Sequence, residues 1–228
     1  MMLLNLLQGP VDLSVVVISI TVMLFALIFH NVVQAWLASR YGDSTPRYAG
    51  FLSFDPQRHL DLMGVLFLML LGLGWTVPIP VNSRNYRGRG YDEVKVWYSG
   101  PLAFLLVAFV STIIAALFAR MDQGNLTQAF LTASYYSVLH AVIHLFPVWP
   151  LDGARAALAS GNRSLKQFVY QIQSYGNLGF LVFFLLMGVL GITGNLIDLF
   201  RGSSVVWWVL FCRSLLKLLF SLSPYDGS

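Results

Sequence analysis

The residue types in this chain that can do chemistry are histidine and aspartate, placed in or beside long stretches that otherwise carry no charge. His30 lies in the first such stretch, His140 and His144 lie four residues apart in a later one, and Asp152 follows directly after it. Ionisable groups at membrane depth are costly to bury, so each is by default a candidate functional residue. Imidazole and carboxylate are common ligands of zinc, and residues four apart share one face of a helix. These residues predict a buried site that handles a metal ion or a proton.

The composition of the chain around these residues is that of a membrane protein. Of its 228 residues, 57% are hydrophobic and 11% are charged, whereas soluble domains carry about 25% charged residues. A spanning helix needs about 20 apolar residues. Four runs without Asp, Glu, Lys or Arg are longer than this: 13–39, 96–119, 123–151 and 167–197. We therefore expect an integral membrane protein that crosses the bilayer several times.

Two further apolar segments differ from these runs. Segment 62–75 is fourteen residues long and is followed by Pro78, which favours a short re-entrant element over a full crossing. Segment 203–220 carries Arg213 and Lys217. It either spans the bilayer with both charged groups snorkelling or lies in the interface.

The charge distribution predicts an orientation. Segments 40–61, 82–95 and 153–168 together hold ten of the fourteen Lys and Arg residues, and cytoplasmic loops of membrane proteins carry such an excess. We expect these segments in the cytoplasm, in a multi-pass protein of the cell (inner) membrane. Short extended pieces at 47–53 and 77–81 are then expected to form a small cytoplasmic-side sheet. A net charge of +4 excludes the dense basic patch of a nucleic-acid-binding protein, so the lipid bilayer is the expected partner.

The cysteine count and the N-terminal sequence exclude two other arrangements. Cys212 is the only cysteine, so neither an intramolecular disulfide nor a cysteine-type metal site is expected. The first Lys or Arg is Arg40, so the first apolar run lacks the positively charged region that opens a signal peptide. We expect this run to remain as an anchor.

A series of short motifs resembles the site-2 protease family of intramembrane zinc metalloproteases. The landmarks are, in chain order, His30…Gln34-Ala35, Gly42-Asp43, Asp55-Pro56 with His59, Pro78-Ile79-Pro80-Val81-Asn82, Ser99-Gly100-Pro101-Leu102 and Pro147…Leu151-Asp152-Gly153. They keep the order and spacing of that family and cover about residues 25–160. The resemblance implies a polytopic fold around a zinc centre, with a substrate groove near Asn82 and Pro147. It also implies that a transmembrane protein is the client.

The active-site positions depart from that family in a consistent direction. The HExxH helix of the family supplies two zinc ligands and a glutamate that activates water as a general base. Here His30 matches the first ligand, Asn31 replaces the glutamate and Gln34 replaces the second histidine. An amide cannot take a proton from water, and its neutral oxygen is a poor zinc ligand. Asp152 matches the third ligand, and Phe104 stands where the family has a polar asparagine.

Three interpretations of these residues stay open. In the first, which we favour, the chain is a pseudoprotease that binds or regulates membrane-protein clients and needs no cofactor, because loss of the base alone costs about 10²–10⁴-fold in rate. In the second, it is an active metallopeptidase whose zinc is re-sited on His30, His144 and Asp152, with His140 as a fourth or supporting group. In the third, the same groups form an ion or proton relay in a transporter, although the sequence has no internal repeat of the kind many transporters carry.

The sequence as a whole predicts an all-α polytopic membrane protein with five to six transmembrane or near-spanning helices, one short re-entrant element and a small cytoplasmic-side β-sheet. Residues 1–228 are expected to form a single domain, with the motif core at about 25–160 and C-terminal helices at about 176–222. Gly100-Pro101 is expected to begin a helix. Arg155 is expected to pair with Asp152, and His59 is expected to have a structural role.

Overall fold

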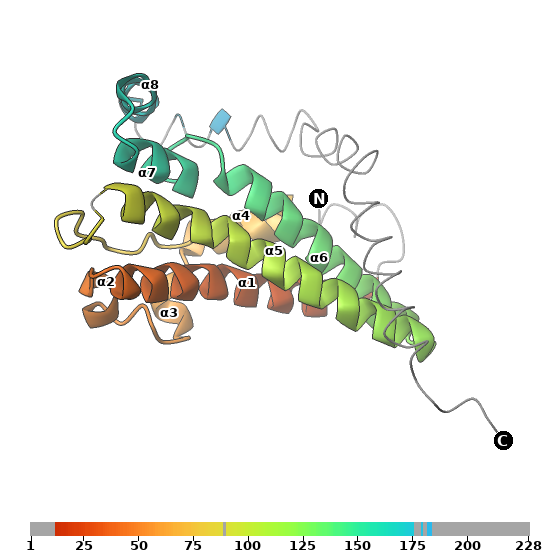
Figure 1. The fold of residues 1–228 in the computed structure, drawn as a ribbon. Helices are drawn as coiled ribbons and strands as arrows, with labels where there is room; N and C mark the ends of the chain where they lie inside the picture. Colours follow the sequence, from red (N-terminus) through yellow and green to blue (C-terminus); the bar gives the residue numbers. More distant parts are fainter. Residues whose placement is uncertain (1–11, 89, 176–178, 180–181, 184–228) are drawn as a thin grey trace, which may run out of the picture.

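The computed structural model describes residues 12–88, 90–175, 179 and 182–183 of the chain. These residues form eight helices, labelled α1 to α8 in Figure 1. Their bounds are Leu13–Arg40, Thr45–Tyr48, Pro56–His59, Leu62–Leu71, Gly90–Arg120, Gly124–His144, Asp152–Ala159 and Arg163–Gln173. The predicted domain organisation stays a prediction, and the predicted C-terminal helices at about 176–222 lie almost entirely outside the described residues.

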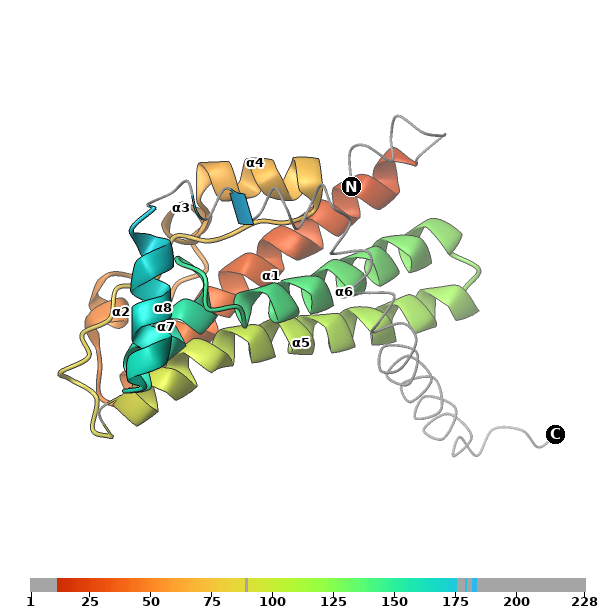
Figure 2. The same ribbon diagram turned by 90° about the horizontal axis from the view of Figure 1, so that it is seen from above.

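Three long helices, α1, α5 and α6, run side by side and enclose the main apolar core (Figures 1 and 2). Met23, Leu27, Phe104 and Ile143 are among the core side chains that are fully or almost fully buried. The first helix begins at Leu13, and the carboxylate of the preceding Asp12 caps it by accepting the backbone N–H of Ser14. Because three elements contribute to one core, side chains from distant parts of the sequence meet between them.

The short helix α4 lies against the long helices without being able to cross a bilayer. Its ten residues rise about 15 Å, half of the roughly 30 Å of bilayer hydrocarbon. Asp61 caps its start by accepting the N–H of Gly64, and Gly72 ends it with a left-handed backbone at φ 76°. A Cβ at Gly72 would overlap the ring of Tyr136, so both the backbone angle and the packing require glycine there.

The predicted number of membrane-spanning helices is wrong for the described part of the chain. Only α1 and α5 there are both long enough and apolar enough to cross a membrane. Helix α6 has the length, but polar residues such as Asn125, Gln128 and His140 lower its hydropathy. Of the predicted spans, segment 203–220 and most of 167–197 lie outside the described residues.

The predicted cytoplasmic-side sheet is also wrong, because the described residues contain no strand. Their nearest approach to a sheet is one isolated antiparallel bridge between Leu60 and Thr76. Segment 47–53 instead begins within the helical turn α2, which Pro46 favours at its start, and then bends at Gly50 with φ 83°. In segment 77–81, Pro78 and Pro80 lack the N–H groups that a ladder of strands requires.

Helix α5 corrects a third expectation, because it begins ten residues before Gly100-Pro101. Its first turn carries Asp92 and Glu93, which the positive end of the helix dipole stabilises. Pro101 therefore lies inside the helix instead of at its start.

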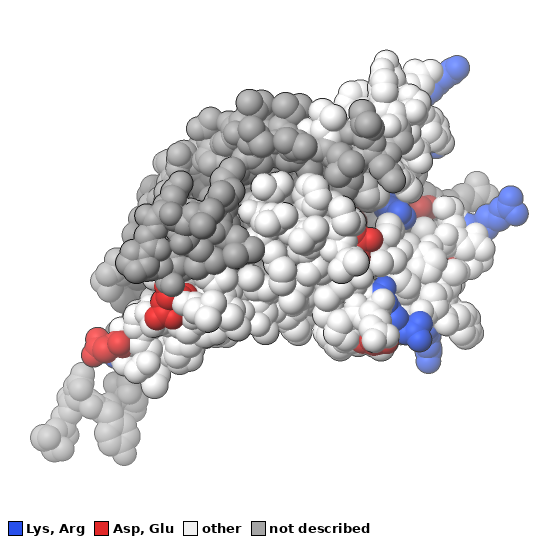
Figure 3. Space-filling model, turned by 180° about the vertical axis from the view of Figure 1, so that it is seen from behind, with Lys and Arg blue, Asp and Glu red and all other residues white. Residues whose placement is uncertain are grey.

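The basic residues of the described chain gather mainly at one end of the molecule (Figure 3). This end carries the end of α1 and the short helices α2, α3 and α8, which bring Arg40, Arg47, Arg58 and Arg163 together. The opposite end carries Arg120 at the end of α5. Such an excess of basic residues at one end is what the positive-inside rule associates with a cytoplasmic face.

Asp43 fastens the loop before α5 to the end of α1 at this basic end. Its fully buried carboxylate accepts hydrogen bonds from the N–H and hydroxyl of Thr45, at 3.1 and 2.5 Å, from the N–H of Asn82, at 2.7 Å, and from the amide of Asn85, at 3.0 Å. Burial alone would raise the pKa of Asp43. These hydrogen bonds outweigh the burial and hold its pKa below the ordinary 3.8.

We expect Asp43→Asn to lower the thermal midpoint of the detergent-solubilised protein at pH 7 by the equivalent of about 2 kcal/mol. A carboxylate with a lowered folded pKa contributes stability that is fully present above 3.8 and is lost as the pH falls through the folded value. The gap between wild type and variant should therefore narrow as the pH is lowered from 7 towards 3. Asp122→Asn, at an exposed aspartate with positive φ, is the control, and a gap that does not change with pH would contradict this account.

Candidate functional site

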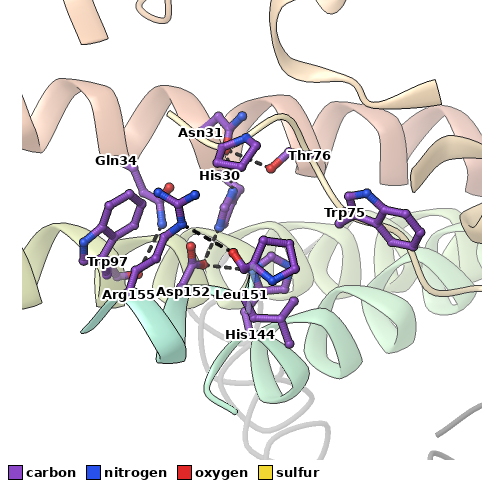
Figure 4. A pocket seen from close by; sticks show the side chains of 12 residues that line it. His30, Asn31, Gln34, Trp75, Thr76, Trp97, His144, Leu151, Asp152 and Arg155 are labelled. Carbon is purple, nitrogen blue, oxygen red and sulfur yellow. Dashed lines mark hydrogen bonds and ion pairs between the residues drawn. The ribbon is translucent and has the colours of Figure 1, made fainter. Parts of the chain in front are cut away.

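Three buried side chains from three helices converge at one point (Figure 4). They are His30 on α1, His144 at the end of α6 and Asp152 at the start of α7. The carboxylate Oδ2 of Asp152 lies 2.6 Å from Nε2 of His30 and 2.9 Å from Nδ1 of His144. All three residues are at most 4% exposed, and one donor atom from each lies within 4.8 Å of the others. They therefore form a cluster of potential metal ligands that is shielded from bulk solvent.

A sharp turn between α6 and α7 brings Asp152 back to His144. Residues 145–151 form a tight connection in which the N–H of Leu151 donates to the carbonyl of Val148 at 2.9 Å. Gly153 packs its backbone directly against the carbonyl groups of Leu145 and Phe146, where a Cβ would overlap them. This close approach places Asp152 beside the last residue of α6.

Gly100 allows α5 to approach α1 at the site. A Cβ at this position would overlap the Nε2 atoms of His30 and Gln34. The absence of a side chain at Gly100 therefore leaves room for the imidazole of His30 and the amide of Gln34. The sequence predicts that the Gly100-Pro101 pair begins a helix. In the structure it instead marks a point where α5 closely contacts α1.

Asn31 holds the ring of His30 in one orientation. Its Nδ2 donates to the carbonyl of Val77 at 2.8 Å, and its Oδ1 accepts the hydroxyl of Thr76 at 3.0 Å. Nδ1 of His30 lies 3.0 Å from the same Oδ1. Because this amide oxygen can only accept, Nδ1 of His30 must carry the proton that it donates.

The orientation set by Asn31 has a consequence for the other ring nitrogen of His30. In a neutral ring whose proton is on Nδ1, Nε2 presents a lone pair. That lone pair faces Oδ2 of Asp152 at 2.6 Å, and two electron-rich atoms repel each other at this distance. A cation must therefore lie between them: a proton at the observed separation, or a metal ion if the two atoms move further apart.

His144 gives a second, independent indication that the cluster needs a cation. If its Nδ1 donates to Asp152, its Nε2 carries a lone pair, and this atom is buried without a hydrogen-bond partner among the described residues. Buried polar atoms are nearly always satisfied in native proteins. The donor set of two imidazoles and one carboxylate is also a common one for zinc. The residues present thus fit a zinc ion.

Gln34 is a structural residue in this arrangement. Because Pro101 has no N–H, the carbonyl of Trp97 one turn earlier lacks its helical donor. Nε2 of Gln34 donates to this carbonyl at 3.2 Å. The residue at the position of the family's second histidine therefore satisfies a carbonyl group that the proline within α5 leaves free.

His140 and Phe104 surround the cluster without belonging to it. Nδ1 of His140 donates to the carbonyl of Tyr136 at 2.7 Å, and its Nε2 accepts the N–H of Gly74 at 3.0 Å. Both ring nitrogens are thus used within the protein, and the ring anchors the chain after α4. The ring of Phe104 stacks on His30 with centroids 4.7 Å apart and lies 5.1 Å from His144, so it forms an apolar wall.

The cavity beside the cluster is small, at about 20 Å³. Its described lining includes His30, Asn31, Gln34, His144 and Asp152, and Thr76, Trp97 and Arg155 line it as well. A volume of this size holds about one water molecule. Thr76 and the carbonyl of Trp97 were not predicted, because their roles depend on contacts between distant segments that no local pattern encodes.

Several other predicted residues lie elsewhere. Asn82 and Pro147, predicted for a substrate groove, do not line the central cavity, and Asn82 belongs to the loop fastened by Asp43. Arg155 forms no ion pair with Asp152; its Nε donates to the carbonyl of Pro150 at 3.4 Å. His59 is buried on Phe51 and donates from Nε2 to the carbonyl of Ser53 at 2.7 Å. Burial lowers the pKa of His59 below its ordinary 6.5, which agrees with a neutral, structural ring.

The described part of the chain thus combines two helices that are long and apolar enough to cross a membrane with a buried His–His–Asp cluster that could hold a metal ion. A comparison with curated proteins finds a relative in Bacillus subtilis (strain 168) named "Putative zinc metalloprotease YwhC". It is 31% identical over 180 residues, which cover 75% of this chain and 82% of the Bacillus protein. The chain belongs to the family of this zinc-metalloprotease-like protein, consistent with the resemblance to the site-2 proteases. No protein-family model and no solved structure matches the chain.

We expect Gly100→Ala to destabilise the protein by about 1–3 kcal/mol, because the added methyl group must displace His30 and Gln34. The measurement is thermal unfolding in detergent, followed by circular dichroism. Gly124→Ala is the matched control, since a Cβ at this position at the start of α6 meets nothing within 4 Å. Equal thermal midpoints for the two variants would show that the stability of the protein does not depend on the close approach of Gly100 to His30 and Gln34.

Proposed function

We propose that this membrane protein is a pseudoprotease, a member of its family that no longer hydrolyses peptide bonds and acts by binding membrane-protein clients. The observation that carries the proposal is the environment of Asn31, at the position of the family's general base. Its amide is engaged by Val77, Thr76 and His30. A group that is fully hydrogen-bonded and cannot accept a proton does not activate water.

The remaining carboxylate near the cluster does not replace the base. Asp152 is the only Asp or Glu among the described residues that line the central cavity. Its Oδ2 is already shared between the imidazoles of His30 and His144. A carboxylate in that position serves as a ligand or as a counter-ion, and a second carboxylate would be needed to take a proton from water.

A long apolar groove supports the client-binding part of the proposal. It has a volume of about 560 Å³ and lies between α1 and α5, where Phe25, Phe29, Leu106 and Val110 line it. These two helices are the ones in the described chain that can span a membrane. An apolar groove at membrane depth fits one face of a client's transmembrane helix, where close packing drives association.

A second candidate function is a re-sited zinc centre held by His30, His144 and Asp152. Two observations favour it: the lone pair of His30 that faces Asp152, and the buried Nε2 of His144 that has no partner among the described residues. Zinc bound there would act as a Lewis acid towards a water molecule or a carbonyl oxygen. Asn31 would then fix the metal-binding tautomer of His30 from the second coordination sphere.

Metal content separates the two candidates. If the centre is re-sited, the protein purified without added metal or chelator should carry close to one zinc ion per chain, and His144→Ala should lose most of it. His140→Gln is the control, because the amide can donate to Tyr136 and accept from Gly74 as the imidazole does. We expect no loss there. Zinc absent from the wild type leaves a metal-free pseudoprotease, in which a proton joins His30 to Asp152.

Restoring the two missing motif residues tests the assignment of the site. Asn31→Glu combined with Gln34→His should increase zinc affinity by at least about tenfold, since it adds a second imidazole one helical turn from His30. Zinc is measured by competition with a chromogenic chelator, and proteolysis is measured with a membrane-spanning reporter substrate. Cleavage of the reporter by the wild type would overturn the pseudoprotease proposal. An unchanged zinc affinity would show that the site lies elsewhere.

A further inference from the structure

A second cavity opens at the basic end of the molecule, apart from the groove between α1 and α5. It has a volume of about 440 Å³ and lies between the start of α5, the helix α7 and the amphipathic helix α8. Gly90 and Glu93 line it from α5, Arg155 from α7 and Lys166 from α8. It is more than large enough to hold a small polar ligand.

The guanidinium of Arg155 is held rigidly in the wall of this cavity. Its central carbon lies 4.7 Å from the ring centroid of Trp97 and 4.6 Å from that of Trp149, which fixes the side chain by cation–π contact. Its Nε atom donates weakly to the carbonyl of Pro150, at 3.4 Å. Figure 4 shows this side chain lying beside Trp97 above the cluster.

The two terminal nitrogens of Arg155 have no hydrogen-bond acceptor among the described residues. No Asp or Glu of the described chain forms an ion pair with it. A guanidinium presents several N–H groups in a planar fork that matches a carboxylate or phosphate group. A fixed fork with open donors in the wall of a cavity is therefore suited to an oxyanion.

The other charges around the cavity leave it with a net positive lining. Lys166 is a second cation, and it too forms no ion pair with the described residues. Glu93 is the one acidic residue in the described lining, and its Oε1 accepts the indole N–H of Trp97 at 3.4 Å.

We propose that this cavity binds a phosphate group, which Arg155 would hold by two parallel hydrogen bonds and Lys166 would neutralise further. The phosphate belongs either to a phospholipid headgroup or to a soluble phosphate compound. The cavity lies at the basic end of the spanning helices, and α8, which contributes Lys166 to it, exposes Leu165 and Phe168. Basic pockets at this level of a membrane protein are suited to lipid headgroups. The inference does not depend on whether the buried cluster binds zinc.

The test uses the full chain in a zwitterionic detergent and two probes, inorganic phosphate and dihexanoyl phosphatidylglycerol. Binding is followed by tryptophan fluorescence, because Trp97 and Trp149 contact the proposed phosphate-binding residue. Arg155→Gln should weaken binding by at least about tenfold, since it removes the charge and the fork. Arg163→Gln, at an exposed arginine on α8 that does not line the cavity, should leave it unchanged.

The two probes distinguish the sources of the phosphate group. Binding of the lipid with an Arg155-dependent affinity, and no competition by millimolar phosphate, identifies a headgroup site. Binding of inorganic phosphate with the same dependence identifies a site for soluble phosphate compounds. Failure of both probes to bind, or equal losses in Arg155→Gln and Arg163→Gln, would overturn the proposal.

Two further variants keep the test decisive if Arg155→Gln does not fold. Arg155→Lys retains the charge between the two indoles but loses the fork, and we expect a loss of about fivefold. Lys166→Gln changes a residue on the surface helix α8, and we expect a loss of about threefold from the missing charge. Unchanged affinity in both would show that neither cation contacts the phosphate.

Discussion

The arrangement of the long helices depends on one buried carboxylate that is shared by two imidazoles. Asp152 contacts His30 and His144, and through them α7 is tied to both α1 and α6. Breaking a buried charge pair by removing one partner leaves an uncompensated charge, which costs about 3–5 kcal/mol. The turn after α6, the glycine that lets α5 approach, and the aromatic wall of Phe104 all serve to bring these three groups within hydrogen-bond distance and to keep water away from them.

The two amides next to this cluster are best understood as structural replacements. Asn31 satisfies the carbonyl of Val77, and Gln34 satisfies the carbonyl of Trp97 that Pro101 leaves without a donor. Buried carbonyl groups without partners cost about 1–3 kcal/mol each. Polar side chains at positions 31 and 34 are therefore required whatever the chemistry of the site, because the backbone around it needs hydrogen-bond donors.

The sequence predicted the parts of this structure that depend on composition and spacing. The apolar runs 13–39 and 96–119 correspond to the long helices α1 and α5, and the structure brings His30, His144 and Asp152 together. Interactions between distant segments were not predictable in the same way. The sheet was inferred from short extended segments, but strand pairing depends on backbone donors that Pro78 and Pro80 lack. Arg155 was assigned to Asp152 by proximity in sequence, whereas its planar group is stabilised between Trp97 and Trp149.

Trp97 and Arg155 separate the buried cluster from the cavity at the basic end, since both residues line the two spaces. The inner space, of about 20 Å³, leaves room for about one water molecule. An ion that moves between the cluster and the basic end by this route must wait for the guanidinium and the indole to separate. The rate of that opening then limits how fast the cluster can exchange an ion along this route.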